Sequence, residues 1–227
     1  MTSTTSRPKL IIFDCDGVLV DSEPLSIRVL VETMASLGVP MSARQCYELF
    51  LGRSFMSMKL TLLEKFNLEL TDKQIEGMRT QLSDLYRREL LPIAGVARTL
   101  ETLAIPCCVA SSSFPDRIRL SLEVTGLSRF FGDHIFSASM VANGKPAPDL
   151  FLHAASRMGQ APKDCLVIED SPAGLEAART AAMRSFAFLG GSHAASAGLR
   201  ETIAPMRPTC IFERMEDLPR LISELSS

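Results

Sequence analysis

Two aspartates separated by a single residue follow a short apolar run near the start of the chain. Residues 10–13 lead directly into Asp14 and Asp16, within the stretch IIFDCDGVLVDSE. Two carboxylates this close repel each other unless a cation lies between them, and burial at the end of a strand adds a desolvation cost. The pair has no evident structural use. It therefore predicts a site where a metal ion, a lysine or a substrate offsets the charge.

The elements that must position these aspartates alternate between strands and helices. Apolar runs predict buried strands at residues 10–13, 107–110, 165–168 and 186–189, with weaker runs at 135–136 and 209–212. Helical apolar spacing predicts helices between them, at residues 95–103, 114–127, 148–159 and 171–183. This alternation is typical of an α/β fold in which helices cover both faces of a mostly parallel sheet.

Reactive side chains also follow the other predicted strands. Ser111 ends the second run, Glu169 and Asp170 follow the run at 165–168, and Lys145 lies in the loop NGKPAPD before a helix. In open parallel sheets the working site lies beyond the carboxyl ends of the strands. Residues scattered at random over loops would not gather at one edge, so the pattern predicts a single site there.

The alternation stops between Pro24 and about Leu90, where the chain reads as consecutive helices. The segments SARQ (residues 42–45) and TDKQ (residues 71–74) both fit the capping-box pattern of a helix start. The second opens a long helix whose apolar face comprises Ile75, Met78, Leu82, Leu85 and Tyr86. We therefore expect residues 1–23 and 91–227 to form an α/β core and residues 24–90 to form an all-helical cap.

This set of residues suits the hydrolysis of a phosphate monoester. Asp14 can attack phosphorus as a carboxylate nucleophile, while Asp16 protonates the leaving oxygen and then deprotonates water. A hard divalent cation removes the repulsion between the two anions, and Asp14, the Asp16 carbonyl and Asp170 are oxygen ligands that suit Mg²⁺.

Other groups at this edge are suited to holding the phosphate itself. Ser111 and the backbone N–H groups of Cys15 and Ser112 are expected to bind its equatorial oxygens. Lys145 is expected to balance charge on the nucleophile and on the transferred phosphoryl group.

Four ordered motifs resemble those of the haloacid dehalogenase superfamily: DCDGVLVDS at residues 14–22, Ser111, KPAPDLF at residues 145–151, and VIEDSPAG at residues 167–174. The resemblance runs from about Lys9 to the last helix. It implies a Rossmann-like core with a helical cap, as in the beta-phosphoglucomutase and phosphoglycolate phosphatase branch. It also implies an aspartyl-phosphate intermediate and the roles already given for the matching residues, with Glu169 as a metal ligand acting through water.

Other chemistries within the superfamily fit this sequence less well. Haloacid dehalogenases lack a second aspartate and need no metal, whereas this chain has Asp16 and an acidic pair. Beta-phosphoglucomutases carry a histidine and an arginine where this chain has Ser26 and Phe55. A phosphonatase needs a Schiff-base lysine in its cap, for which Lys59 and Lys65 qualify by location alone.

Two further alternatives come from other classes of protein. A protein that only binds a phosphorylated ligand would not require an acid/base residue such as Asp16, and an EF-hand would need acidic residues at later loop positions. A sugar-phosphate mutase and a non-catalytic phospho-ligand-binding protein remain the alternatives to a phosphatase.

Composition restricts the partners of this 227-residue chain. Lys and Arg number 24 against 26 Asp and Glu, so there is no basic field for nucleic acid or an anionic membrane. The cysteines form no CxxC pair and are expected to be free thiols: Cys15, Cys46, Cys107, Cys108, Cys165 and Cys210. Without an apolar leader or membrane span, we expect a cytoplasmic monomer that acts on a small phosphorylated metabolite.

The remaining polar residues carry weaker expectations. Arg53 is a candidate contact from the cap to an acidic substrate, with a solvated surface position as the equal alternative. His134, His153 and His193 fit no ligand spacing and are expected to have packing or surface roles. Residues 190–198 are predicted to form a flexible loop.

Overall fold

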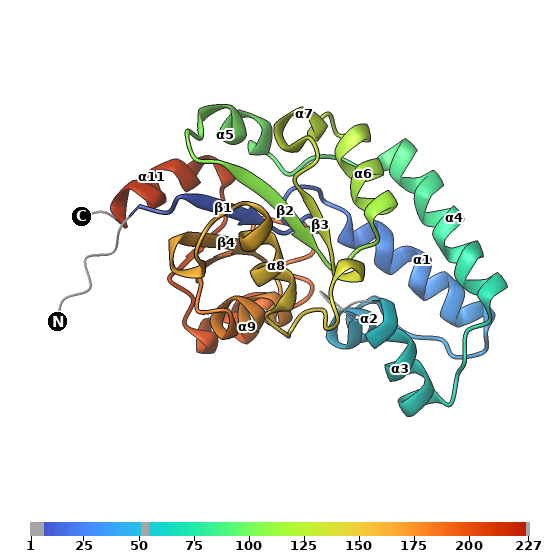
Figure 1. Cartoon of the computed structure of the whole chain (residues 1–227). Coiled ribbons are helices and arrows are strands. Elements are labelled where there is room, and N and C mark those ends of the chain that lie inside the picture. The colour runs from blue at the N-terminus through green and yellow to red at the C-terminus, as the bar shows by residue number, and fades with distance from the viewer. Residues whose placement is uncertain (1–6, 51–54, 226–227) are drawn as a thin grey trace.

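A six-stranded parallel sheet forms the centre of the protein in a computed structural model that describes residues 7–50 and 55–225. The strand order is β3-β2-β1-β4-β5-β6 (Figure 1). The strands are β1 (Leu10–Phe13), β2 (Cys107–Ser111), β3 (Ile135–Ser137), β4 (Cys165–Glu169), β5 (Arg184–Phe188) and β6 (Cys210–Phe212). All five pairings between neighbouring strands are parallel, which confirms the predicted α/β, Rossmann-like fold.

Helices cover both faces of this sheet because side chains alternate along each strand. In β1, Ile11 and Phe13 pack toward α5, α6, α7 and α11, while Leu10 and Ile12 pack toward α8 and α9. The bounds are α5 (Val96–Thr102), α6 (Pro115–Val124), α7 (Ser128–Phe131), α8 (Asp149–Arg157), α9 (Pro172–Thr180), α10 (Leu199–Ile203) and α11 (Leu218–Glu224). Short 3₁₀ turns lie at Ala138–Met140, Pro162–Asp164, Ala204–Met206 and Met215–Asp217.

Four helices interrupt the α/β pattern after β1, as the sequence predicts. They are α1 (Glu23–Ser36), α2 (Ala43–Phe50), α3 (Phe55–Phe66) and α4 (Asp72–Glu89), and we call them the helical segment. They have a core of their own, which includes Ile27, Leu30, Met34, Tyr47 and Leu62. Both predicted capping boxes form, at residues 42–45 and 71–74. Helix α4 also packs beside α6 (Figure 1), so the segment rests on one end of the sheet.

The two connections between the sheet and the helical segment run side by side. Asp21 N donates to Leu91 O at 3.0 Å, Ile93 N donates to Leu19 O at 2.9 Å, and Val20 forms an antiparallel bridge with Pro92. The chain therefore leaves the core and returns to it at neighbouring positions.

Two of the sequence predictions differ from the structure in detail. The helix predicted over residues 114–127 is α6, which ends at Val124, because Gly126 adopts a left-handed φ of 72° and Leu127 N bonds back to Leu122 O at 2.7 Å; α7 begins after it, at Ser128. The loop predicted at residues 190–198 contains no helix or strand, and buried His193 and Ala194 anchor its centre, while its flexibility stays a prediction. Within the described residues, none of the helices has the length and apolar character to cross a membrane.

Candidate active site

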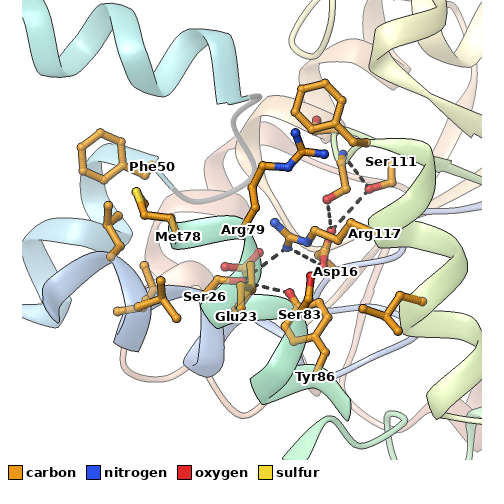
Figure 2. Close-up of a pocket in the computed structure, with 18 of the residues that line it drawn as sticks. Asp16, Glu23, Ser26, Phe50, Met78, Arg79, Ser83, Tyr86, Ser111 and Arg117 are labelled. Atoms are coloured by element: carbon orange, nitrogen blue, oxygen red, sulfur yellow. Dashed lines mark hydrogen bonds and ion pairs between the residues drawn. The ribbon is translucent and has the colours of Figure 1, made fainter. Parts of the chain in front are cut away.

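A cavity of about 340 Å³ lies where the carboxyl ends of β1, β2 and β4 face the helical segment. Strand ends supply Asp14, Asp16, Asp170 and residues 111–113 to its lining. The opposite wall comes mainly from α1 and α4 (Figure 2). The predicted core residues are therefore brought together at one edge of the sheet.

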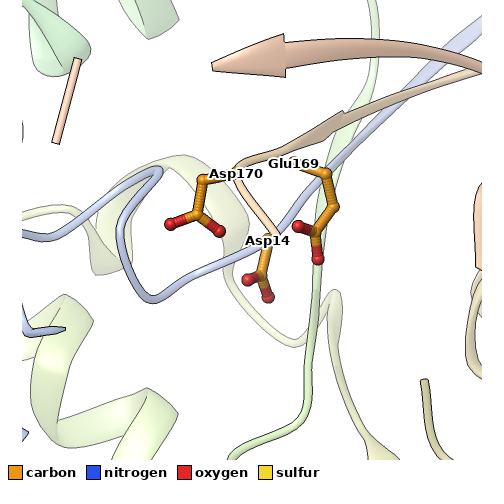
Figure 3. A group of neighbouring side chains, drawn as sticks. All are labelled: Asp14, Glu169 and Asp170. Carbon is orange, nitrogen blue, oxygen red and sulfur yellow. The ribbon is translucent and has the colours of Figure 1, made fainter. Parts of the chain in front are cut away.

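Three acidic side chains converge at the base of this cavity. Carboxylate oxygens of Asp14, Glu169 and Asp170 lie within 4.8 Å of one another (Figure 3), and all three residues are buried. Burial raises the pKa of Asp14 and of Asp170 well above the usual range, and the neighbouring carboxylates raise both further. Without added positive charge, the site thus resists full ionisation.

Lys145 supplies part of that positive charge from the loop before α8. Its Nζ lies 2.9 Å from Asp14 Oδ1 as an ion pair and donates a 2.6 Å hydrogen bond to Glu169 Oε1. Burial lowers the pKa of Lys145, but the charges of Asp14 and Glu169 outweigh this and raise it, so the ammonium stays charged. Lys145 is therefore fixed beside the predicted nucleophile.

Glu169 has both carboxylate oxygens occupied by protein groups. Oε1 accepts from Lys145, and Oε2 accepts from Ser171 N at 2.7 Å and Ser171 Oγ at 2.9 Å. Gly174 leaves the room for this carboxylate, because a Cβ there would lie 1.8 Å from Glu169 Oε1. In this arrangement Glu169 holds Lys145 and the start of α9, and its role toward a metal stays a prediction.

The arrangement fits a hard cation such as Mg²⁺. Asp14 Oδ1 lies in the ion pair with Lys145 and Asp170 Oδ2 lies 3.0 Å from His193 Nε2, but neither buried oxygen has a partner with hydrogen-bond geometry among the described residues, and the acidic cluster offers only carboxylate oxygens to a metal. Gly17, with a φ of 77°, keeps space beside Asp170, since a Cβ there would lie 1.9 Å from Asp170 Oδ2. A divalent cation stabilises buried carboxylates whose oxygens lack hydrogen-bond donors and whose pKa values are raised.

Asp16 lies in a different environment from its neighbours. Oδ1 accepts from Ser22 Oγ at 2.6 Å and Arg117 at 2.8 Å, and Oδ2 accepts from Ser113 Oγ at 2.6 Å and more weakly from Ser111 Oγ at 3.4 Å. Burial raises its pKa, but the Arg117 charge and the hydrogen bonds outweigh burial and lower it. Asp14 and Asp16 therefore differ in protonation tendency, although one residue separates them.

Sequence reasoning missed Arg117, the cation that sets this difference. Arg117 lies in the first turn of α6, six residues after Ser111, and its guanidinium stacks over the Tyr86 ring at 5.4 Å. It also reaches Ser26 Oγ at 3.4 Å, so it joins the sheet edge to α1 and α4 (Figure 2). A basic residue in the first turn after a strand-end serine is the only sequence signal that pointed to it.

The predicted phosphate-binding residues lie in the same place. Ser111 is the last residue of β2 and accepts a hydrogen bond from Ser113 N at 3.1 Å, while Ser112 lines the cavity. Cys15 sits between the two aspartates, and burial raises the pKa of its thiol well above the usual range. The thiol is therefore inert, and its backbone remains the part of Cys15 with a predicted role.

The helical wall of the cavity is polar near Asp16 and apolar farther out. Ser26 Oγ and Tyr86 Oη lie 3.1 Å apart, and Glu23 beside them has a pKa raised to about 8, by burial first and then by Asp16 and Asp170. Arg79 reaches from α4 over the Phe114 ring, at 5.1 Å. Apolar wall residues include Ile27, Leu30, Phe50, Met58 and Met78.

Several residues singled out in the sequence do not line this cavity or lie outside the described residues. Arg53 falls outside the described residues, and Phe55 is the first residue of α3. Lys59 and Lys65 are also on α3, and neither is among the described residues that line the cavity. The arrangement thus brings no lysine of α3 to the strand ends.

His193 is the second residue that sequence reasoning missed. It is fully buried, and its Nε2 lies 3.0 Å from Asp170 Oδ2. Burial lowers its pKa, although Glu23 and Asp21 act in the opposite direction, so the ring is neutral near pH 7. Its segment lacks any periodic pattern, and no signal in the sequence placed it at the site.

Comparison with known proteins agrees with the geometry. The model of the haloacid dehalogenase-like hydrolase family matches residues 8–182. The 6-phosphogluconate phosphatase of Escherichia coli (strain K12) is 28% identical over 189 residues, which cover 83% of this chain and 86% of that protein. Hexitol phosphatase B of the same organism is 33% identical over 188 residues, which cover 81% and 84%.

A solved structure shows the same fold over nearly the whole chain. It is a conserved haloacid dehalogenase-like protein of unknown function from Agrobacterium tumefaciens str. C58, and it is 34% identical with a TM-score of 0.81. The match covers 96% of this chain and 99% of that one.

Proposed function

The chain belongs to the haloacid dehalogenase-like hydrolases and is a phosphoric monoester hydrolase, and we propose that it uses Mg²⁺ to hydrolyse a small phosphorylated sugar or sugar acid. The observation that carries the proposal is the convergence of Asp14, Asp16, Lys145 and Asp170 at the strand ends. The reaction passes through an aspartyl-phosphate on Asp14.

In the first half of the reaction, a carboxylate oxygen of Asp14 attacks phosphorus and the bond to the ester oxygen breaks. Asp16 gives its proton to that leaving oxygen. In the ligand-free site, Arg117 and Ser113 hold Asp16 ionised. The incoming phosphate competes for these donors, and its negative charge raises the pKa of Asp16, so substrate binding favours the proton that the first step needs.

In the second half, ionised Asp16 removes a proton from water, and the hydroxide attacks phosphorus and releases inorganic phosphate from Asp14. Lys145 stays charged beside Asp14 throughout, where it stabilises the carboxylate before attack and again after release. Asp14, Asp170 and the Asp16 carbonyl are the ligands we assign to Mg²⁺, which when bound would screen the repulsion between carboxylate and phosphate. Glu169 would act through water.

Residues 24–90 act as a cap in this proposal, with residues 1–23 and 91–227 as the core. Its support is that α1 and α4 form one wall of the cavity and shield the strand ends from solvent. Hinges at residues 22–24 and 91–95 adjoin the hydrogen-bonded pair of connections.

Hydrolysis is favoured over the mutase alternative by the residue at position 26. Ser26 is hydrogen-bonded to Tyr86 and Arg117, and it has no titratable group that could protonate a leaving sugar. Asp16, buried among four donors, argues against a protein that only binds a phosphorylated ligand, because binding alone does not require that carboxylate.

A phosphate-release screen tests the proposal. Purified protein is assayed with Mg²⁺ against sugar phosphates, sugar-acid phosphates, polyol phosphates and an aryl phosphate, and each assay is repeated with a chelator. We expect turnover of at least one sugar-derived ester that stops on chelation and returns with Mg²⁺. Turnover that survives chelation would remove Mg²⁺ from the proposal, and release from none of the esters would overturn hydrolysis.

A further inference from the structure

His193 occupies a slot that the chain keeps open with glycine. A Cβ at Gly17 would lie 2.9 Å from His193 Cε1, and a Cβ at Gly191 would lie 2.7 Å from Cε1 and 2.8 Å from Nδ1. All three distances are too short for a real side chain, so two glycines on different segments make room for one imidazole. Such a slot fixes the ring in place.

The polar contact of this ring is with Asp170. Nε2 lies 3.0 Å from Asp170 Oδ2, and neither atom makes a hydrogen bond with a third group among the described residues. Nδ1 has no hydrogen-bond partner among the described residues, so the charge of Asp170 beside Nε2 is the polar contact that offsets the cost of burying this ring, which an apolar side chain would not incur. The position of His193 therefore serves the carboxylate in front of it.

The imidazole also contacts the helical segment. The Tyr47 ring of α2 stacks on it with a centroid separation of 6.1 Å and an interplanar angle of 29°. The same loop is tied to the connection that precedes α1, because Ser192 N donates to Asp21 Oδ1 at 3.1 Å. Ala197 packs against the core of the helical segment. One loop thus links Asp170 to α2 and to the start of α1.

We propose that His193 is a positioning residue, which holds the Asp170 carboxylate for Mg²⁺ and makes that hold depend on the docking of α2 through Tyr47. This inference rests on the metal site of the proposed function. A carboxylate ligand that is held by a neighbouring group binds metal more tightly than one free to rotate, and loss of such a neighbour weakens binding about 10–100-fold. A change in the position of the helical segment would therefore change the affinity for Mg²⁺ through the loop after β5.

Mg²⁺ binding to the purified protein, measured by calorimetry without substrate, tests the first part. The variants His193→Leu and His193→Gln have side chains of similar size, but only glutamine keeps a polar end near Asp170. We expect Leu to weaken Mg²⁺ binding at least tenfold and Gln to recover most of the loss. His153→Phe is the control, because His153 lies edge-on to Phe136 and outside the cavity lining.

The link to α2 is tested by a double-mutant cycle. Tyr47→Leu removes the ring and is expected to weaken Mg²⁺ binding about threefold, whereas Tyr47→Phe keeps the stack and should leave binding unchanged. If Tyr47 acts through His193, the double variant with His193→Leu loses no more affinity than His193→Leu alone. In turnover assays, the KM for Mg²⁺ should rise while kcat at saturating Mg²⁺ changes little.

The outcomes separate this inference from the proposed function. Absence of Mg²⁺ binding in the wild type would overturn both. Binding in the wild type with equal affinity in His193→Leu and His193→Gln would overturn the inference alone, as would additive losses in the double variant. Melting temperatures without Mg²⁺ identify any variant that fails to fold, and in that case His193→Gln and Tyr47→Leu decide.

Discussion

The sheet side and the helical side of the cavity differ in how deeply their charged groups are buried and how closely they are paired. On the sheet side, Asp14, Glu169 and Lys145 are almost wholly buried, and each contacts a partner of opposite charge. On the helical side, Arg79 is half exposed and its nearest acidic partner, Glu76, lies 3.9 Å away. Under the proposed function, the buried and paired charges of the sheet side suit the chemistry common to phosphate esters, and the exposed groups of the helical side suit recognition of the leaving group.

This difference gives each side its own mutational signature. Changes on the sheet side should reduce the rate for every phosphate ester, because every ester passes through the same attack on phosphorus. Changes on the helical side should alter KM for some esters and leave others untouched.

The largest effect is expected from Asp14→Asn. Loss of the nucleophile should lower kcat by about 10⁴-fold or more for all substrates, because the aspartyl-phosphate on Asp14 can no longer form. Steady-state phosphate release measures it, with Asp133→Asn, an exposed aspartate before β3, as the control. A loss confined to one ester would contradict a role for Asp14 in the step common to all esters.

The next largest effect is expected from Asp16→Asn, about 10²–10⁴-fold in kcat for an alkyl phosphate. The loss should be much smaller for an aryl phosphate such as p-nitrophenyl phosphate, whose leaving group needs no proton in the first step. Comparing kcat for the two esters measures the contribution of proton donation. Equal losses would show that Asp16 acts through Arg117 and structure, not as an acid.

Glu23 lies at the border of the two sides and should make stability depend on pH. Burial raises the pKa of Glu23 in the folded protein to about 8, from an ordinary value of 4.5. Between these pH values the folded state holds a proton that the unfolded state has lost, so this residue makes the free energy of unfolding fall as pH rises.

Glu23→Gln should therefore be less sensitive to pH than the wild type between pH 5 and pH 8, by on the order of 2 kcal/mol, because Glu23 is partly exposed. Urea unfolding with a chelator present measures it, and exposed Glu64→Gln is the control. The same slope in wild type and Glu23→Gln would place Glu23 with the solvated helical groups.

The smallest effect is expected from Arg79→Gln. It should raise KM about tenfold for a sugar-acid phosphate, whose second anion loses a cation, and leave KM for a hexitol phosphate unchanged. Arg98→Gln on α5, outside the cavity lining, is the control for charge. Equal changes for both esters would separate Arg79 from recognition of the leaving group.

The sheet side was predictable from sequence because strand periodicity is local. Short apolar runs ending in Asp14, Ser111 and Glu169 locate three strand ends, and parallel strands must align those ends. Roles for these residues stay predictions, but their meeting place follows from the pattern alone.

The helical side was not predictable because it depends on how helices pack. The direction of Arg117 is fixed by the rotation of α6 against Tyr86, and the position of Arg79 by the packing of α4 beside α6. His193 depends on a loop without periodic pattern, held by contacts with Gly17 and Tyr47 that are distant in sequence. Such contacts carry no local signal.

The paired connections at residues 19–21 and 91–93 also bear on how such a chain diversifies. The chain leaves the core and re-enters it at two segments that are hydrogen-bonded to each other. The hydrogen bonding of the sheet therefore does not depend on the length of the chain between these segments. An exchange of the intervening helices would leave the strand ends in register. Under the proposed function, this arrangement permits exchange of the helical segment while the acidic residues at the strand ends are kept.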